Sequence, residues 1–254
     1  MNTNDRLHQV YASKWKTLCQ KLDEVDLRGY DYSPLLLSVT NPDDFDTADI
    51  KVMLFGQDMS YGDWYIYDRH TQPLEECMRA IRTFDNTVGA VDLNGRKQRK
   101  SIGGGMNKFI DMFNARFPDK KIRYVWNDVV KLGRNVTKGN PHKNLLAEIE
   151  RDYFNVVKEE INAIKPHVMV FLTGPNSFWE RRLQQCLGID ASCYQPLPGW
   201  SGNVRQLALL DLHKEEYPSV QYAFRTYHPC AREARIYVKH SDLYQAIANH
   251  LQCF

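Results

Sequence analysis

The clearest hydrophobic pattern in the chain is the run Ile50-Lys51-Val52-Met53-Leu54-Phe55-Gly56. Consecutive apolar residues, rather than alternating ones, are typical of a strand that is buried on both faces, as in a parallel sheet. The run ends at Gly56, where a tight turn can form, and Gln57 and Asp58 follow. Because ligands bind at the carboxyl ends of strands in open α/β sheets, Asp58 is a candidate site residue. The alternative is that Asp58 caps a following helix.

Further apolar runs alternate with helical patterns along the rest of the chain. Buried strands are predicted over Ile122–Trp126, His167–Leu172 and Tyr222–Thr226. Apolar residues at three- and four-residue spacing predict helices over Asn4–Val25, capped by Asn4 or Asp5, and over Pro73–Val88, Met106–Phe117, Asn144–Ile164 and Leu243–Leu251. Strands that alternate with helices favour a mainly parallel sheet with right-handed crossovers. We therefore expect an α/β fold: a three-layer α/β/α sandwich around a four-stranded, mainly parallel sheet.

Three segments lack a regular pattern. Asp31–Asp49 is rich in Pro and Asp and is expected to run over the surface, apart from Leu35-Leu36-Leu37. Asp92–Gly105 is predicted to be a loop, and Ile189–His213 a short hairpin or irregular excursion. No repeat or low-complexity linker divides the chain. We expect a single domain over residues 1–254, in which residues 1–49 form an N-terminal helix and a surface-wrapping segment.

The charge of the chain is nearly balanced. Lys and Arg number 33 against 31 Asp and Glu, a formal net charge of +2, so no global field demands a polyanionic partner. Any nucleic-acid site must come from local basic clusters, of which Arg96–Lys100 is the densest. No apolar run is long enough to span a membrane and no export signal is visible, so we expect a cytoplasmic protein, most simply a monomer.

The six cysteines do not form a metal-binding pattern. They are Cys19, Cys77, Cys186, Cys193, Cys230 and Cys253. None makes a Cys-x-x-Cys pair, and their spacing fits neither a zinc site nor an iron–sulfur cluster. We expect free thiols, no metal and no cofactor.

Three predicted strands end on polar side chains. These are Asp58, Asn127 and His228, and parallel strands place their carboxyl ends at one edge of a sheet. Residues far apart in the sequence are therefore expected to face one cleft. Each residue also has a structural interpretation, since Asp58 can cap a helix, Asn127 can bond a turn and His228 can be a satisfied core histidine.

The strand ends resemble the motifs of the uracil-DNA glycosylase superfamily. Gly56-Gln57-Asp58 is similar to its water-positioning motif, Asn127 to its base-reading Asn, and His228-Pro229-Cys230 to its His-Pro-Ser motif near the C-terminus. Val170-Phe171-Leu172-Thr173-Gly174 resembles a further strand of the family. The similarity keeps the family's order and spans the chain from Ile50 to the C-terminus.

The chain also departs from that family. Met59-Ser60-Tyr61 stands where the familiar form has Pro-Tyr-His, and Cys230 replaces the Ser of His-Pro-Ser. Arg232 occupies the usual place of an apolar wedge. These differences indicate a distant branch, for which the fold is a safer expectation than the substrate.

The resemblance implies cleavage of the N-glycosidic bond of uracil or a related damaged base in DNA. Asp58 and His228 would be catalytic, and Gln57, Ser60, Tyr61, Trp64 and Asn127 would bind the substrate. Arg232, Arg235 and Lys239 would contact single- or double-stranded DNA. The alternatives are a nucleoside- or nucleotide-hydrolysing protein on the same fold and an inactive binding module. Salt dependence separates them, because only DNA binding should weaken steeply with salt.

Overall fold

The centre of the fold is strand β2 (Ile50–Gly56), which is buried along its whole length. The computed structural model describes residues 1–25, 32–57, 73–78, 100–134 and 143–251. Within them β2 pairs in parallel with β3 (Ile122–Asp128) and with β5 (Val168–Phe171). The next strand, β8 (Tyr222–Thr226), is parallel to β5. The four predicted strands are thus confirmed as the parallel part of the sheet.

The sheet has six strands rather than the predicted four. Its order is β3-β2-β5-β8-β7-β6, where β7 (Leu207–Leu210) and β6 (Tyr194–Pro196) continue it in antiparallel pairing. Both added strands come from the segment predicted to be a hairpin or an irregular excursion. Strand β6 has no apolar run, and although Leu207–Leu210 is apolar, antiparallel neighbours need no crossover helix that would have placed it in the sheet. A separate pair joins β1 (Tyr32–Pro34) to β4 (Leu132–Arg134).

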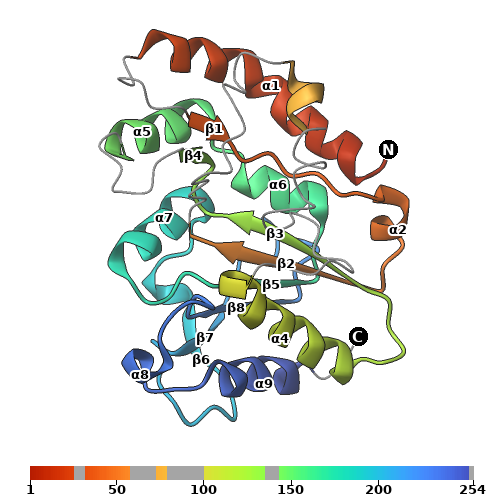
Figure 1. The fold of residues 1–254 in the computed structure, drawn as a ribbon, viewed down its shortest axis with the longest axis vertical. Coiled ribbons are helices and arrows are strands. Elements are labelled where there is room, and N and C mark those ends of the chain that lie inside the picture. The colour runs from red at the N-terminus through yellow and green to blue at the C-terminus, as the bar shows by residue number, and fades with distance from the viewer. Residues whose placement is uncertain (26–31, 58–72, 79–99, 135–142, 252–254) are drawn as a thin grey trace.

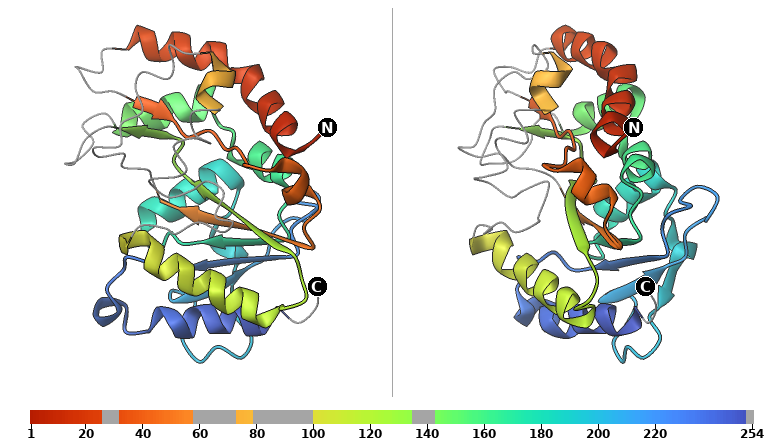
Figure 2. Two further views of the ribbon diagram at one scale, coloured as in Figure 1. Left: turned by 45° about the vertical axis from the view of Figure 1, so that its right-hand side comes forward. Right: turned by 90° about the vertical axis from the view of Figure 1, so that its right-hand side faces the viewer.

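Helices cover both faces of the sheet (Figures 1 and 2). Apolar residues of α1 (Thr3–Glu24), α6 (Val157–Ile164) and α7 (Ser177–Leu187) share one core with Met53 and Phe55. The helices α4 (Lys100–Arg116) and α9 (His240–His250) share the other core with Val52 and Leu54. Alternate residues of β2 therefore enter opposite cores, as the pleat of a strand requires.

The long helix predicted over Asn144–Ile164 is wrong, because the structure divides it. Helix α5 (Lys143–Tyr153) stops before Phe154, and α6 begins at Val157. The break allows Phe154 and Val156 to be fully buried beside α1, with the Phe154 ring stacked 6.1 Å from that of Tyr11. Burial of these side chains outweighs the continuous helical pattern.

Two other helix boundaries differ from the prediction. Helix α4 begins at Lys100, so its first turns include the three glycines 103–105 that were expected in a loop. Helix α9 begins at His240 rather than Leu243. A four-residue helix, α8 (Glu233–Ile236), precedes it. Of the helix predicted over Pro73–Val88, residues 74–78 are helical and residues 79–88 lie outside the described part.

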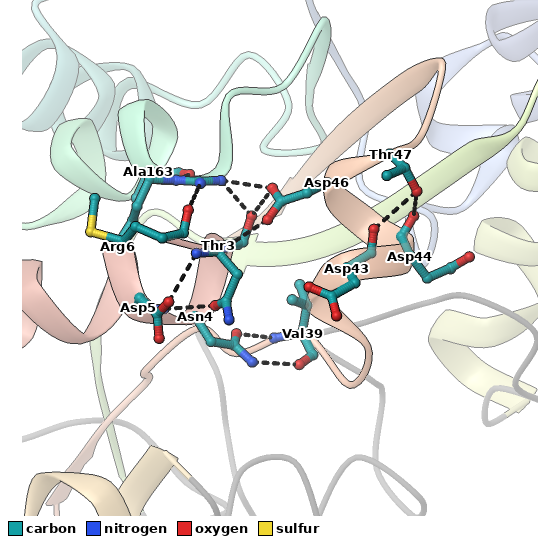
Figure 3. Close-up of polar contacts among 12 residues, drawn as sticks. Thr3, Asn4, Asp5, Arg6, Val39, Asp43, Asp44, Asp46, Thr47 and Ala163 are labelled. Atoms are coloured by element: carbon teal, nitrogen blue, oxygen red, sulfur yellow. Dashed lines mark hydrogen bonds and ion pairs between the residues drawn. The ribbon is translucent and has the colours of Figure 1, made fainter.

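The N-terminal helix is anchored by polar side chains (Figure 3). Its cap is Asn2, not Asn4 or Asp5, in a capping box with Asp5. Arg6 donates to the Ala163 carbonyl at 2.7 Å and pairs with Asp46 at 2.8 Å, at the end of α2 (Pro42–Asp46). Charge-assisted bonds of this kind fix both partners, so α1 is joined to α2 and α6. The segment between α1 and α2 includes Leu35–Leu37, which are buried.

Candidate functional site

The carboxyl ends of the parallel strands lie together at one edge of the sheet, on the left in Figure 1. The loops that leave this edge are bonded to one another. The Val130 amide donates to the Gln57 carbonyl at 3.3 Å, and the Gly174 amide donates to the Thr226 carbonyl at 2.9 Å. The Gln57 side chain also donates from Nε2 to the Thr173 carbonyl at 3.0 Å. Gln57 thus ties the end of β2 to the end of β5.

Gly56 is required by close packing rather than by its backbone angles. A Cβ atom at this position would overlap Oδ1 of Asp128 and the indole ring of Trp126, which lie beside it on β3. The carboxylate of Asp128 is therefore pressed against the strand end that leads into Gln57. Sequence reasoning did not select Asp128, although it directly follows Asn127 and its side chain must take the opposite face of β3.

Several predicted site residues lie outside the described residues. These are Asp58, Ser60, Tyr61 and Trp64. The basic residues 96–99 lie outside them as well. The structure describes the strand that ends at Gly56 and the placement of Gln57, the residue directly before Asp58.

His228 lies two residues beyond β8 and is partly exposed. Its Nδ1 atom accepts the Cys230 amide hydrogen at 3.2 Å, so the proton of a neutral ring is on Nε2. Burial, together with the nearby His240, holds the pKa of His228 below its usual value. Both effects favour a neutral imidazole that donates from Nε2. Within the described part of the chain, Nε2 has no bonding partner.

The turn that carries His228 is held by a set of side chains here called the edge cluster, which comprises His228, Glu233 and His240. The Nε2 atom of His240 lies 3.1 Å from the His228 carbonyl. Glu233 Oε1 accepts the His240 amide at 2.8 Å and lies 3.3 Å from its Nδ1 atom. His240 is 7% exposed. Glu233 and His240 were not predicted as site residues. Their only signal in the sequence was that they follow shortly after His228.

Asn127 belongs to a different set, here called the inner cluster, which comprises Tyr11, Asn127, Lys131 and Glu160. The Asn127 side chain donates to Glu160 at 2.9 Å and accepts from Lys131 at 2.6 Å. Its Oδ1 atom also accepts the Asp128 amide at 2.9 Å. An amide oxygen has two lone pairs, so this atom is fully occupied and one amide hydrogen remains. Asn127 must therefore give up some of these hydrogen bonds before it can bond the imide edge of a base.

The inner cluster is sealed from solvent. All four of its side chains are fully buried. Lys131 pairs with Glu160 at 2.8 Å, and the Tyr11 hydroxyl donates to the same carboxylate at 2.6 Å. The hydroxyl in turn accepts the Leu37 amide at 2.7 Å, which joins α1 and the segment after β1 to the cluster. Burial and Glu160 hold the pKa of Tyr11 well above its usual value.

The basic residues that follow His228 lie on the surface. Arg232 precedes α8, Arg235 lies within it, and Lys239 precedes α9. All three are exposed. Figure 1 places α8 on the same side of the molecule as the carboxyl ends of β2 and β3. Three cations, His228 and Gln57 therefore lie toward the end of the sheet where the parallel strands stop.

A cavity elsewhere in the molecule does not include these residues. It has a volume of about 700 Å³ and lies along α9, near the beginning of β8, where Tyr222, Asn249 and His250 line it. None of the predicted site residues is in its lining.

The described residues show neither a metal-binding group nor a membrane-spanning helix. They contain no group of three or more His, Cys, Asp or Glu residues placed to hold a metal ion. No described helix has the length and apolar character needed to cross a membrane. Comparison of the chain with family models, with curated proteins and with solved structures found no match.

Proposed function

We propose that this protein is a DNA glycosylase-like hydrolase that cleaves the N-glycosidic bond of uracil or a related damaged base. The observation that carries the proposal is the bond from the Cys230 amide to Nδ1 of His228, which puts the proton of a neutral ring on Nε2, at the same edge of the sheet where β2 ends at Gly56. The proposal takes the fold as a three-layer α/β/α sandwich with its site at the carboxyl edge of the parallel strands.

His228 acts on the departing base in this proposal. Cleavage of the glycosidic bond places negative charge on the base and positive charge on the sugar. A donor aimed at the base oxygen is worth most when that charge has developed, since its bond is then strongest. The Nε2–H of neutral imidazole supplies that bond without a proton transfer. The bond from the Cys230 amide to Nδ1 supports this role, because it selects the Nε2–H tautomer.

Asp58 acts on the sugar. A carboxylate stabilises the oxocarbenium-like transition state and orients the attacking water. The Gln57 side chain, bonded to the Thr173 carbonyl, restrains the residue directly before Asp58. The base must leave the stack or come from a single strand, and an aromatic such as Trp64 or Tyr61 stacks on it. Arg232, Arg235 and Lys239 contact the DNA backbone, and the enzyme acts as a monomer without a metal or cofactor.

The second candidate is a protein that binds or hydrolyses free nucleosides or nucleotides. Two observations favour it: the net charge of only +2, and an Asn127 amide oxygen already occupied by protein donors. A free nucleoside needs no basic surface, so its binding should change little with salt, whereas DNA binding should weaken steeply.

The test is an excision assay on the purified full chain. Oligonucleotides with uracil or other damaged bases, single- and double-stranded, are incubated with the protein and abasic sites are scored. Asp58→Asn and His228→Ala should each reduce the rate by about 10²–10³-fold. His167→Ala is the matched control, since Nδ1 of His167 also accepts a backbone amide, from Lys51 at 3.1 Å, at the amino end of the sheet. Equal activity of His228→Ala and His167→Ala contradicts the proposal.

A further inference from the structure

His240 is a buried histidine whose two ring nitrogens both face acceptors. Nε2 lies 3.1 Å from the His228 carbonyl, and Nδ1 lies 3.3 Å from Glu233 Oε1. A carbonyl oxygen can only accept, so the Nε2 atom of His240 must carry a proton. Its own backbone amide also donates to Glu233, at 2.8 Å. The ring is therefore anchored through Nε2, and the Glu233 carboxylate holds the adjacent backbone; the contact at Nδ1 is a hydrogen bond when the ring is protonated.

The same carbonyl belongs to the turn that sets the tautomer of His228. The His228 carbonyl accepts the Ala231 amide at 2.8 Å as well as the His240 ring. The Cys230 amide, inside this turn, donates to Nδ1 of His228 at 3.2 Å. If the carbonyl rotates, the Cys230 amide moves with the turn and the bond to Nδ1 is lost. The orientation of the carbonyl and the position of the His228 proton are thus linked.

We propose that His240, held by Glu233, is a positioning residue that keeps the His228 turn in the geometry that leaves the His228 Nε2–H free for the substrate. This inference rests on the proposed function for its catalytic meaning. Its structural part, the control of the His228 tautomer, stands on the contacts alone.

Other ionisable groups surround the pair and must be followed in any titration. Lys108 of α4 interacts with Glu233, and Tyr244 of α9 interacts with both Glu233 and Cys230. The ring of Tyr244 lies 6.0 Å from that of His240. His240 itself lowers the pKa of His228, so its replacement is expected to raise that pKa.

The test uses two amides that imitate different nitrogens of the ring. The side-chain nitrogen of Gln occupies roughly the place of Nε2, and that of Asn the place of Nδ1. His240→Gln can therefore keep the bond to the His228 carbonyl, whereas His240→Asn keeps only the contact with Glu233. A role in packing alone predicts that neither variant changes the tautomer of His228.

The main measurement is NMR of the full chain labelled with ¹⁵N-histidine. The parent and His240→Gln should show His228 with its proton on Nε2, and His240→Asn should show a mixture of tautomers. His250→Gln is the control, because His250 lies on the same helix and packs on Tyr222 and Phe224 instead. If His240→Asn does not fold, Glu233→Ala, compared with Glu233→Gln, tests the same chain of contacts from a side chain that is 48% exposed.

The excision assay supplies a second measurement. His240→Asn should lower kcat by up to about 10²-fold with little change in KM, because a misplaced donor costs rate rather than binding. His240→Gln should recover most of that loss. An unchanged His228 tautomer in both His240→Asn and Glu233→Ala, or equal tautomer mixtures in His240→Asn and His240→Gln, overturns the proposal. If no substrate is cleaved, the proposed function fails and the NMR result still decides the positioning role.

Discussion

The inner cluster and the edge cluster are built from similar hydrogen bonds but differ in their access to solvent. In the inner cluster a buried carboxylate, Glu160, accepts from Tyr11, Asn127 and Lys131, and all four side chains are fully buried. In the edge cluster the carboxylate of Glu233 is 48% exposed, and Nε2 of His228 is left for another partner.

The difference indicates what each cluster can do. The bonds of the inner cluster are complete without any ligand, and they join α1, α6 and the end of β3. Their loss should therefore be seen as a loss of stability. The bonds of the edge cluster orient a group that still has a proton to donate, so changes there should alter chemistry with little effect on stability.

The largest expected effect is in the inner cluster. Glu160→Ala leaves the Lys131 charge buried without its partner, and removing one member of a buried pair costs about 3–5 kcal/mol. The free energy of unfolding in urea measures this. Glu159→Ala, its neighbour on α6, is the control: its pair with Lys14 is on the surface, where such pairs contribute about 0–1 kcal/mol. Similar losses for the two variants would show that the inner cluster has no special role in stability.

The next largest effect is expected on the selectivity for the base. Ser60 stands where the familiar enzymes of the resembling family have a Tyr that excludes the methyl group of thymine, and it lies outside the described residues. We expect the parent to tolerate C5-substituted uracils, and Ser60→Tyr to reject them by a further factor of about 10–200.

Excision of uracil, thymine and 5-substituted uracils opposite guanine measures this selectivity. Urea unfolding of the same variant should be unchanged, in contrast to Glu160→Ala. If the parent already rejects every C5 substituent and Ser60→Tyr changes nothing, then Ser60 does not line the pocket.

A smaller effect is expected from the exposed cations beside the edge cluster. Replacing Arg232 and Arg235 together by Ala should reduce the steepness of log affinity for DNA against log salt by roughly 2. The loss of affinity between 50 and 200 mM salt should then be about tenfold smaller in the variant than in the parent. Fluorescence anisotropy with a labelled oligonucleotide measures the slope. The charge-matched control is the double variant of Arg116 and Lys120, which are exposed beside the amino end of β3. Equal slopes for both double variants favour a small-molecule ligand.

The smallest effect is a pH dependence of stability that arises from His228. Its folded-state pKa is lowered by burial and by His240, so protonation is harder in the folded than in the unfolded chain. The unfolded state then binds more protons, and stability rises with pH. The stability that His228 contributes is fully present above its unfolded-state pKa of about 6.5. It is lost as the pH falls below that pKa. Urea unfolding from pH 5 to 8 should therefore show a shallower slope for His228→Asn than for the parent.

The sequence by itself determined the elements whose signal is local. The run from Ile50 predicted a strand buried on both faces, and β2 is buried on both faces because its alternate residues enter two cores. The order of strands and helices likewise predicted the four parallel strands. A local pattern suffices for these because the periodicity of apolar residues directly reflects the geometry of one element.

Only the tertiary structure decided which polar side chains meet. Asn127 and Asp128 are neighbours in the sequence, yet Asn127 is bonded to Glu160 in the inner cluster while Asp128 is pressed against Gly56. The partners of His228, the joining of β6 and β7 to the main sheet, and the division of the helix at Phe154 likewise had no local signal. Each depends on contacts between segments distant in the chain. A local pattern predicts that a side chain is buried. It does not show which distant residue forms the hydrogen bonds that a buried polar group requires.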